Sequence, residues 1–335
     1  MFDTIKKTIG IVLKGALAAL VLVGGPIALV GYELYEYAIE RDNHRSLLAI
    51  RDKLYAKKNP IPPKKAGITF EDCEEITRIG MNWFWAQDLE TVSIKSYDGL
   101  RLVGYYLAAD KPSKKTMLLM HGYRCNDLRD FANLLEFYHN LGYNILYPYQ
   151  RSHGKSEGTK ICYGVKERYD VLHWTRFLVG KVGKDSEIVL AGISMGAATV
   201  LMSTGLPLPV QVKGVIADCG FTSPRDIFAN VLKDVPDRVS GILLFAADLI
   251  AKNLAGFGFT QYSAPKALKK CKLPVLFIHG KEDDFVPPSM TKINYEACAS
   301  RKEVLYVEHA AHGTSNMVNP VLYRNTVEKF LGTLS

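Results

Sequence analysis

The chain has 335 residues, of which 48% are hydrophobic and 23% are charged, and this balance excludes an intrinsically disordered protein. The formal net charge is +8, and most of it comes from residues 41–65, where eight basic residues meet two acidic ones. The rest of the chain is near neutral, which argues against a nucleic-acid enzyme, because such enzymes spread basic charge over a binding face. A basic strip beside a membrane segment fits lipid head groups, and a solvated helix face is the simpler alternative.

The N-terminal region contains an apolar run, residues 9–31, that holds a single charge at Lys14. A helix of this length, at ~1.5 Å per residue, crosses the ~30 Å hydrocarbon core of a bilayer. We therefore expect residues 1–31 to be an uncleaved single-pass membrane anchor, with membrane lipid as a partner. A removed signal peptide and a soluble helix are the alternatives. Basic residues on the two flanks favour opposite orientations, and we expect the remaining chain to be extracytoplasmic.

A second region, residues 32–89, has helical character on both sides of a proline cluster. The patterns predict helices over residues 32–58 and 70–89, and the prolines at residues 60–63 indicate a linker or a sharp corner between them. We expect residues 32–89 to form a helical segment next to the membrane.

From residue 90 onward, short apolar strands alternate with helices. Such repeated alternation predicts an α/β domain over residues 90–335, with a mostly parallel central sheet and helices on both faces. The first two strands flank a hairpin turn at Asp98-Gly99. The predicted strands cover residues 91–96, 100–109, 117–122, 144–149, 187–192, 212–220, 273–280 and 303–310, and the predicted helices cover residues 131–141, 167–179 and 321–331.

One insertion interrupts this alternation at about residues 224–264, where no strand is predicted. Residues 239–254 carry apolar side chains at positions 242, 245, 249 and 250, which is a helical spacing. We expect a small helical lid above the carboxyl ends of the strands. An ordinary helix packed against the core is the alternative.

The strongest chemical motif is G-x-S-x-G at residues 192–196, with Ser194 at its centre. An apolar strand precedes it and small residues follow, as a sharp strand-to-helix turn requires. In such a turn the serine has a strained backbone, and the glycines let the strand and helix approach each other. A small-residue turn without chemistry is the alternative. A serine hydroxyl becomes a good nucleophile only with a base in reach and a carboxylate that orients the base.

Candidate partners for Ser194 lie downstream, in the chain order nucleophile, acid, base that is typical of this turn. Asp283 and Asp284 follow one predicted strand, and His309 and His312 follow the next. We expect Asp283 to be the acid because of its place in the loop. We expect His312 to be the base, because it lies beyond the strand and His309 lies closer to it. Asp284 and His309 are the alternatives.

Two backbone N–H groups are needed to stabilise an oxyanion. Met195, which follows the nucleophile, is expected to supply one, and Tyr123, in the loop after the strand at residues 117–122, the other. His121 and His153 precede the nucleophile in the chain, which favours structural roles for both. Arg124 faces either the site or solvent, and the sequence does not distinguish these.

The chain resembles the α/β-hydrolase superfamily over about residues 70–335. Within it, the chain is similar to bacterial membrane-anchored hydrolases related to serine aminopeptidases and prolyl oligopeptidases. The resemblance implies the α/β-hydrolase fold. The sequence departs from the family pattern at Tyr149 and Ser152, which stand where the family has an acid and a glycine. This departure puts the local turn geometry in doubt. The matching motifs are His121-Gly122-Tyr123, residues 192–196, residues 279–287 and Ala311-His312-Gly313.

These motifs predict a serine hydrolase that cleaves carboxylic esters with acyl or lipid-like groups through an acyl-enzyme. A serine peptidase or aminopeptidase and a thioesterase use the same groups and stay open. A non-catalytic binding module is a different class, disfavoured because every member of the triad is available. No nucleotide motif is present and the six cysteines show no metal-ligand spacing, so we expect neither a cofactor nor a metal.

Overall fold

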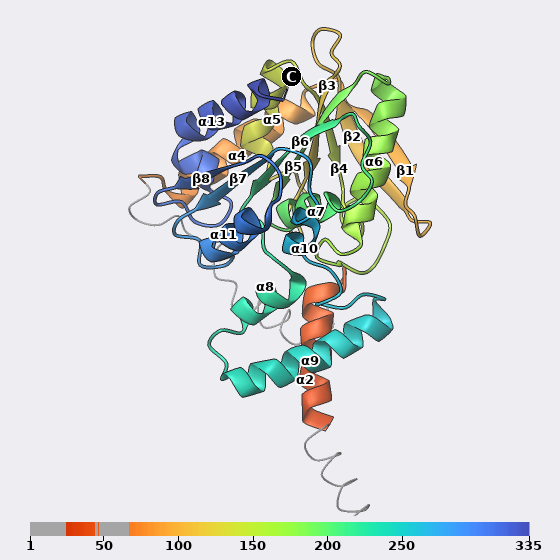
Figure 1. The fold of residues 1–335 in the computed structure, drawn as a ribbon, viewed down its shortest axis with the longest axis vertical. Coiled ribbons are helices and arrows are strands. Elements are labelled where there is room, and N and C mark those ends of the chain that lie inside the picture. Colours follow the sequence, from red (N-terminus) through yellow and green to blue (C-terminus); the bar gives the residue numbers. More distant parts are fainter. Residues whose placement is uncertain (1–24, 44–45, 47–66, 335) are drawn as a thin grey trace, which may run out of the picture.

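The computed structural model describes residues 25–43, 46 and 67–334. In this part of the chain, eight strands form one sheet in the order β1-β2-β4-β3-β5-β6-β7-β8 (Figure 1). β1 and β2 are antiparallel to their neighbours, and the remaining strands run parallel, which confirms the mostly parallel sheet. The strands are β1 (Glu90–Lys95), β2 (Arg101–Leu107), β3 (Lys115–Met120), β4 (Asn144–Pro148), β5 (Glu187–Ile193), β6 (Val212–Asp218), β7 (Val275–Gly280) and β8 (Lys302–Val307).

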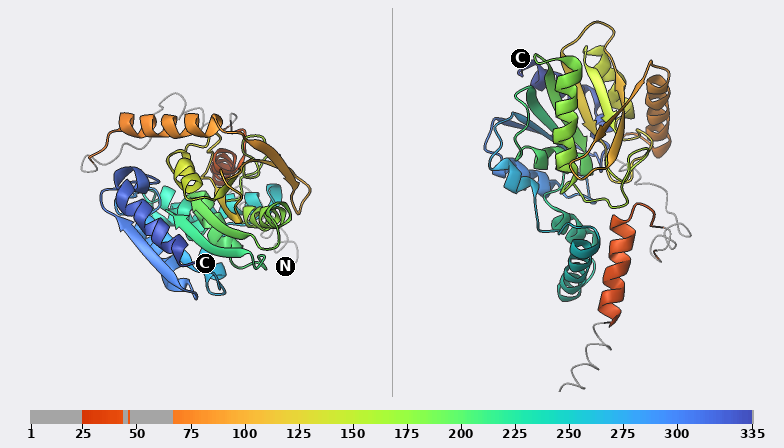
Figure 2. Two further views of the ribbon diagram at one scale, coloured as in Figure 1. Left: turned by 90° about the horizontal axis from the view of Figure 1, so that it is seen from above. Right: turned by 90° about the vertical axis from the view of Figure 1, so that its right-hand side faces the viewer.

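Helices cover both faces of this sheet, as predicted. One face lies under α4, α5 and α13, and the other under α6, α7 and α11, each over its own buried apolar cluster (Figure 2). Every residue of β4 and β7 is buried, which explains why these strands are uninterrupted apolar runs. The helices are α2 (Gly25–Ile39), α4 (Phe70–Trp85), α5 (Ala132–Asn140), α6 (Glu167–Val182), α7 (Met195–Ser203), α8 (Pro224–Val231), α9 (Asp237–Leu254), α10 (Ala264–Leu268), α11 (Pro288–Ala297), α12 (Ser315–Val318) and α13 (Pro320–Gly332).

The helix predicted over residues 32–58 is too long. α2 ends at Ile39 and residues 40–43 are not helical, while most of the remaining prediction lies outside the described residues. The helix ends because Glu40 forms an isolated β-bridge with Lys160, and because side chains of the sheet domain bind the last carbonyl groups of α2.

The predicted membrane anchor falls mostly outside the described residues. Residues 25–31, the end of the apolar run, form the first part of α2. Among the residues that the structure describes, no helix is both long and apolar enough to cross a bilayer. An anchor within residues 1–31 and an extracytoplasmic location therefore stay predictions.

The segment predicted as a lid holds α8 and α9, which lie beside α2 beyond one end of the sheet (Figure 1). α2 and α9 approach closely at Gly31, where an added Cβ would lie 2.8 Å from the Cβ of Ala246. The positions that the sequence grouped as a stripe do not form the buried face. Ile242, Phe245 and Leu249 are exposed, and the buried residues of α9 are Leu244, Ala247 and Ala251.

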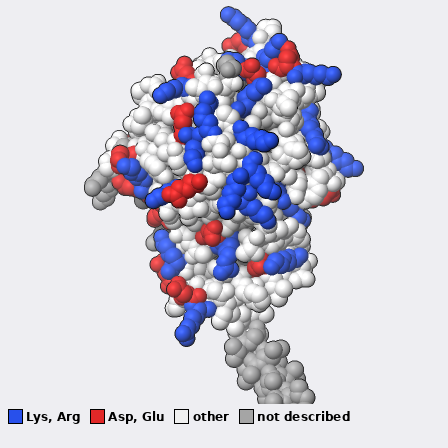
Figure 3. All heavy atoms as spheres, in the orientation of Figure 1, with Lys and Arg blue, Asp and Glu red and all other residues white. Residues whose placement is uncertain are grey.

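Charged side chains are mixed on the face seen in Figure 3, where acidic groups lie among the basic ones. Most of the basic strip at residues 41–65 lies outside the described residues. The expectation that nucleic acid is not a partner therefore stays a prediction.

Gly80 fixes how closely α4 packs on the sheet domain, because a Cβ there would overlap the backbone carbonyl of Ala132 at the start of α5. We predict that Gly80→Ala lowers the free energy of unfolding by about 1–3 kcal/mol, the usual cost of overpacking. Gly180→Ala is the matched control, since its Cβ would meet nothing within 4 Å, and it should raise stability by about 0.5–1 kcal/mol. Urea denaturation measures both. Equal effects of the two substitutions would contradict the close approach at Gly80.

Candidate active site

Ser194 occupies a strained turn between β5 and α7. Its backbone has φ 56° and ψ −117°, in a region that residues with side chains rarely adopt. The turn is held on both sides, because the Ser194 N–H donates to the carbonyl of Asp218 at 2.9 Å and a Cβ at Gly196 would overlap the carbonyl of Met120. The strain places the side chain at the carboxyl edge of the sheet, at the N-terminus of α7.

The structure brings the three predicted triad residues together. The Nε2 atom of His312 lies 2.8 Å from Ser194 Oγ, and its Nδ1 atom lies 2.7 Å from Asp283 Oδ2. Each residue follows a parallel strand, namely β5, β7 or β8, so all three meet at one edge of the sheet. The alternatives lie elsewhere, since His309 is bound to Glu282 at 2.8 Å and Asp284 is exposed.

The carboxylate of Asp283 is buried and fully hydrogen-bonded. Its Oδ1 atom accepts the backbone N–H groups of Phe285 and Val286 at 3.1 and 2.9 Å. Burial alone raises the pKa of Asp283, but the imidazoles of His279 and His312 outweigh it and lower the pKa to about 2. Asp283 is therefore an anion at neutral pH, ready to hold the Nδ1–H of His312.

His279 also belongs to the site, although the sequence predicted no role for it. Its Nε2 atom lies 3.2 Å from Asp283 Oδ2 and 2.8 Å from the carbonyl of Val286, while Nδ1 lies 2.7 Å from Thr291 Oγ1. A buried imidazole in this place supports the acid at the same Oδ2 atom that His312 contacts. The available signal was its position at the end of β7, four residues before Asp283.

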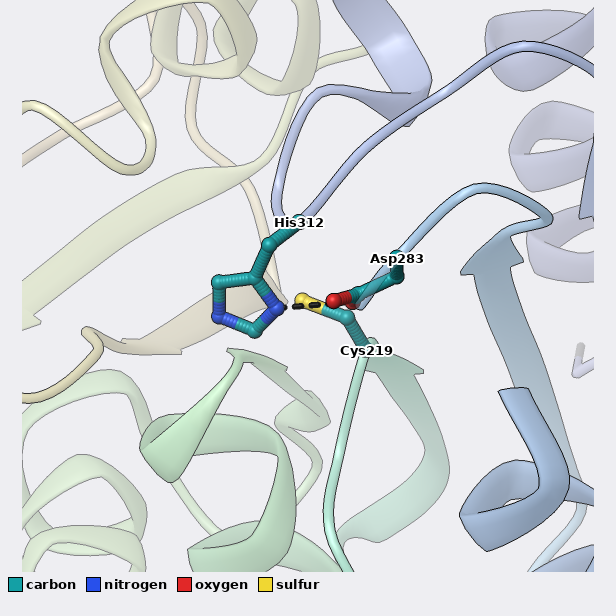
Figure 4. Close-up of side chains that lie close together, drawn as sticks. All are labelled: Cys219, Asp283 and His312. Atoms are coloured by element: carbon teal, nitrogen blue, oxygen red, sulfur yellow. Dashed lines mark hydrogen bonds and ion pairs between the residues drawn. The ribbon is translucent and has the colours of Figure 1, made fainter. Parts of the chain in front are cut away.

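Cys219 also lies beside the acid and the base, as Figure 4 shows, and ligand atoms of the three residues fall within 4.8 Å of one another. Three such atoms can in principle hold a metal ion. Here His312 Nδ1 donates its proton to Asp283, so this nitrogen has no free lone pair for a metal ion. Burial raises the pKa of the Cys219 thiol well above its ordinary value, so the thiol is neutral and a poor ligand.

The predicted oxyanion donors are unpaired in the described part of the chain, where no acceptor is found for the N–H of Tyr123 or Met195. Their neighbours are paired. Gly122 N–H donates to Asp130 Oδ2 at 2.5 Å, and Arg124 N–H donates to His153 Nε2 at 3.0 Å. The loop is therefore fixed around one free N–H, as an oxyanion hole requires.

The histidines upstream of the nucleophile support that loop. The Nε2 atom of His121 accepts the N–H of Gln150 at 3.0 Å, just as His153 accepts the N–H of Arg124. Because a backbone N–H can only donate, both imidazoles carry their proton on Nδ1. Burial lowers the pKa of His121 to about 4 and that of His153 well below its ordinary value. Both are neutral, and neither contacts Ser194.

The stretch that departs from the family pattern keeps a tight turn. Ser152 has φ 65°, the left-handed conformation that a glycine adopts easily, and its hydroxyl donates to the carbonyl of Lys160 at 2.7 Å. The ring of Tyr149 fills the space beside Gly154. The two substitutions therefore leave the turn beside His153 formed.

Arg124 faces neither bulk solvent nor the reacting atoms, but binds the C-terminus of α2. Its guanidinium donates to the carbonyls of Tyr37, Glu40 and Arg41 at 3.1, 2.6 and 2.8 Å. The hydroxyl of Tyr123 donates to the carbonyl of Ala38 at 2.9 Å. A cation at a helix C-terminus satisfies unpaired carbonyls and complements the helix dipole. The oxyanion loop and the N-terminal helix are thus tied together.

An apolar cavity of about 170 Å³ opens at Ser194. Its walls come from the loop and strand ends around the nucleophile and from three helices outside the sheet, α2, α8 and α9. None of the described residues that line it is charged. The lining includes Leu34 and Ala38 of α2, Ile227 and Phe228 of α8, and Leu244 and Ala247 of α9.

Comparisons with known proteins show what the chain is similar to. Residues 189–313 match the family described as serine hydrolase (FSH1). The uncharacterized protein YqkD of Bacillus subtilis is 33% identical over 246 residues, covering 72% of this chain and 79% of YqkD. The esterase Pf2001 of Pyrococcus furiosus superimposes with a TM-score of 0.58 at 23% identity, over 75% of this chain and 95% of its own. The acylaminoacyl peptidase of Pyrococcus horikoshii has a TM-score of 0.55 at 18% identity, over 75% and 42%.

The two candidate bases are distinguished by substitution. We predict that His312→Ala lowers ester turnover by about 10⁴–10⁶, the range for removing a triad histidine. His309→Ala should keep most of the turnover, because His309 binds only Glu282. Steady-state hydrolysis of a nitrophenyl ester measures both, and loss of turnover in His309→Ala with retention in His312→Ala would move the base to His309.

The tie between Arg124 and α2 gives a second prediction. Arg124→Gln should lower kcat for a nitrophenyl acetate about tenfold, a fraction of the ~10²–10³ that one oxyanion donor is worth. The kcat of Arg124→Lys should lie between those of the unchanged protein and Arg124→Gln, because an ammonium group reaches fewer carbonyls than a guanidinium group does. The control is Arg78→Gln, an exposed α4 residue paired only with Glu75. An unchanged kcat in a folded Arg124→Gln protein would show that the tie does not position the loop.

Proposed function

Because the chain belongs to the α/β-hydrolase superfamily of serine hydrolases, we propose that it hydrolyses carboxylic esters whose acyl group is apolar, through an acyl-enzyme on Ser194. The observation that carries this proposal is the uncharged apolar cavity, which begins at the nucleophile and ends among α2, α8 and α9. Burial of an alkyl chain there is favourable by about 0.8 kcal/mol for each CH₂ group.

Acylation begins when Ser194 Oγ attacks the ester carbonyl carbon and its proton passes to His312 Nε2. The anion of Asp283 stabilises the imidazolium, and the N–H groups of Tyr123 and Met195 bind the oxyanion. The tetrahedral intermediate collapses when the bond from carbon to the alcohol oxygen breaks. His312 Nε2 gives its proton to that oxygen, so the alcohol leaves neutral and Ser194 carries the acyl group.

Deacylation repeats these steps with water as the nucleophile. His312 takes a proton from water as the oxygen attacks the acyl carbon, and the same two N–H groups bind the second oxyanion. The bond between the carbon and Ser194 Oγ then breaks, and the proton on His312 returns to the serine. The products are one carboxylic acid and one alcohol for each water consumed.

The size of the cavity sets the preferred acid. A volume of about 170 Å³ is close to that of an engineered apolar cavity of about 150 Å³ that binds benzene, which has six carbon atoms. We therefore expect acyl chains of roughly four to eight carbons to fill the space, with longer chains requiring α2 or α9 to move.

A serine peptidase is the second candidate, since an acylaminoacyl peptidase shares the fold. An aminopeptidase acting on a free N-terminus needs a carboxylate to bind the substrate's ammonium group, and none lines the apolar cavity in the part of the chain described. An ester is therefore the preferred substrate class for this cavity. A thioester can be cleaved by the same catalytic residues with no additional binding group, and it is the third substrate class to compare.

A series of nitrophenyl esters, run beside aminoacyl amides, tests the proposal. We expect kcat/KM to peak at roughly four to eight acyl carbons and to be far lower for the amides. Ser194→Ala should lose both turnover and labelling by a fluorophosphonate probe. Ala247→Leu, which fills the cavity, should move the peak to shorter chains, whereas Gly241→Ala on the same helix meets nothing and should leave it unchanged. Full labelling of Ser194→Ala, or amides turned over faster than esters, would refute the proposal.

A further inference from the structure

A second cavity also reaches Ser194 and differs in chemical character. It is a cleft of about 650 Å³ between α4 and the loop that follows β3, named the polar cleft because charged side chains stand among its apolar ones. The apolar cavity and the polar cleft share only Tyr123, Ser194 and Phe285 among the described residues that line them. The nucleophile therefore stands at the junction of two spaces, and an ester bound across it places one part in each.

The position of His312 decides which part goes where. The imidazole lines the polar cleft and does not line the apolar cavity, while Met195 lines only the apolar cavity. Because His312 Nε2 must give its proton to the departing oxygen, the alcohol must leave on the imidazole side. The acyl group then extends the other way, into the apolar cavity.

The charges of the cleft limit which alcohol it accepts. Glu74, Asp127 and Asp130 line it, and the guanidinium of Arg129 lies between the first two, 2.7 Å from Glu74 and 3.4 Å from Asp127. The other arginine in the wall, Arg124, hydrogen-bonds the neutral carbonyls of α2 and keeps its positive charge. The three carboxylates outnumber the two guanidinium groups that line the cleft, which disfavours a negatively charged alcohol there.

We propose that the natural substrate is an ester of an apolar acid with a small polar alcohol that carries no negative charge, with the acid in the apolar cavity and the alcohol in the polar cleft. This inference rests on the proposed ester hydrolysis and adds the class of alcohol. It also assigns Glu74 and Asp127, on the rim of the cleft, as residues that determine specificity.

Four hexanoate esters test the inference, because they hold the acid constant. Glycerol and glycerol 3-phosphate form one pair that differs in negative charge, and choline and 3,3-dimethylbutanol form a second pair of similar shape that differs in the positive charge of the quaternary ammonium group. We expect kcat/KM to be about fivefold higher for the glycerol and choline esters than for their partners, the upper range for exposed charges. Equal or higher values for the phosphate ester or for the dimethylbutyl ester would overturn the inference.

Adjacent positions on α4 supply a matched pair of variants. Glu74→Gln removes a carboxylate from the cleft and frees Arg129, so the ratio of glycerol to glycerol phosphate turnover should fall about threefold. Glu75→Gln removes a carboxylate that pairs with Arg78 and does not line the cleft, so that ratio should not change. The same shift in both variants, or none in Glu74→Gln, would remove Glu74 from the specificity site.

The outcomes separate this inference from the proposed function. If a fluorophosphonate labels Ser194 and nitrophenyl hexanoate is hydrolysed while the alcohol ratios are reversed, only the inference about the cleft fails. If neither labelling nor ester hydrolysis occurs, the proposed function itself fails. Added salt gives a further check, because a ratio that depends on exposed charges should decrease as ionic strength rises.

Discussion

The left-handed backbone of Ser194 is the constraint on which the rest of the site depends. A residue in such a conformation costs about 1–3 kcal/mol and persists only where its surroundings hold it. Here every residue of α7 is buried, and Gly196 lies against the end of β3 so closely that no side chain fits. The same contact brings the loop that carries Tyr123 next to the nucleophile. The parallel strands β7 and β8 then deliver Asp283 and His312 to the same edge, so one close approach between a helix and a strand organises the chemistry.

A second set of contacts joins this chemistry to a part of the chain far away in sequence. Arg124 and Tyr123 lie in the loop after β3, which carries one of the two predicted oxyanion donors, and their side chains bind the last carbonyls of α2. α2 in turn packs against α9, and the two helices supply walls of the apolar cavity. The hydrogen bonds that end α2 therefore also shape the acyl site. The acid has comparable support, since His279 contacts Asp283 and is itself hydrogen-bonded to Thr291.

Much of the fold followed from the sequence, because the central strands are apolar runs and the outer strands alternate, with turn residues between them. The G-x-S-x-G motif also predicted the chain order of the nucleophile, acid and base. The triad geometry agrees with that order, and the resemblance to α/β-hydrolases is confirmed.

Other features depend on contacts between distant segments. The sequence did not indicate which side of α9 is buried, because apolar residues occur on both sides of the helix. Packing in the folded protein, including the contact with α2, buries Leu244 and Ala247. The end of α2 depends on residues more than 80 positions away in the sequence, which a local pattern does not indicate. The role of His279 depends on its contact with the buried carboxylate of Asp283, which a local pattern does not indicate either.

The helices around the apolar cavity also bear on how such a protein diversifies. α8 and α9 come from one insertion and α2 from the N-terminal region, so none of them contributes a triad residue or an oxyanion N–H. Substitutions at Leu34, Ala247 or Phe228 can therefore alter the shape of the space for the acid while the strained serine and its partners stay in place. Variation in the shape of this cavity can thus arise in segments that carry none of the three triad residues. Among these segments, α2 is also joined to the loop after β3 by the hydrogen bonds of Tyr123 and Arg124.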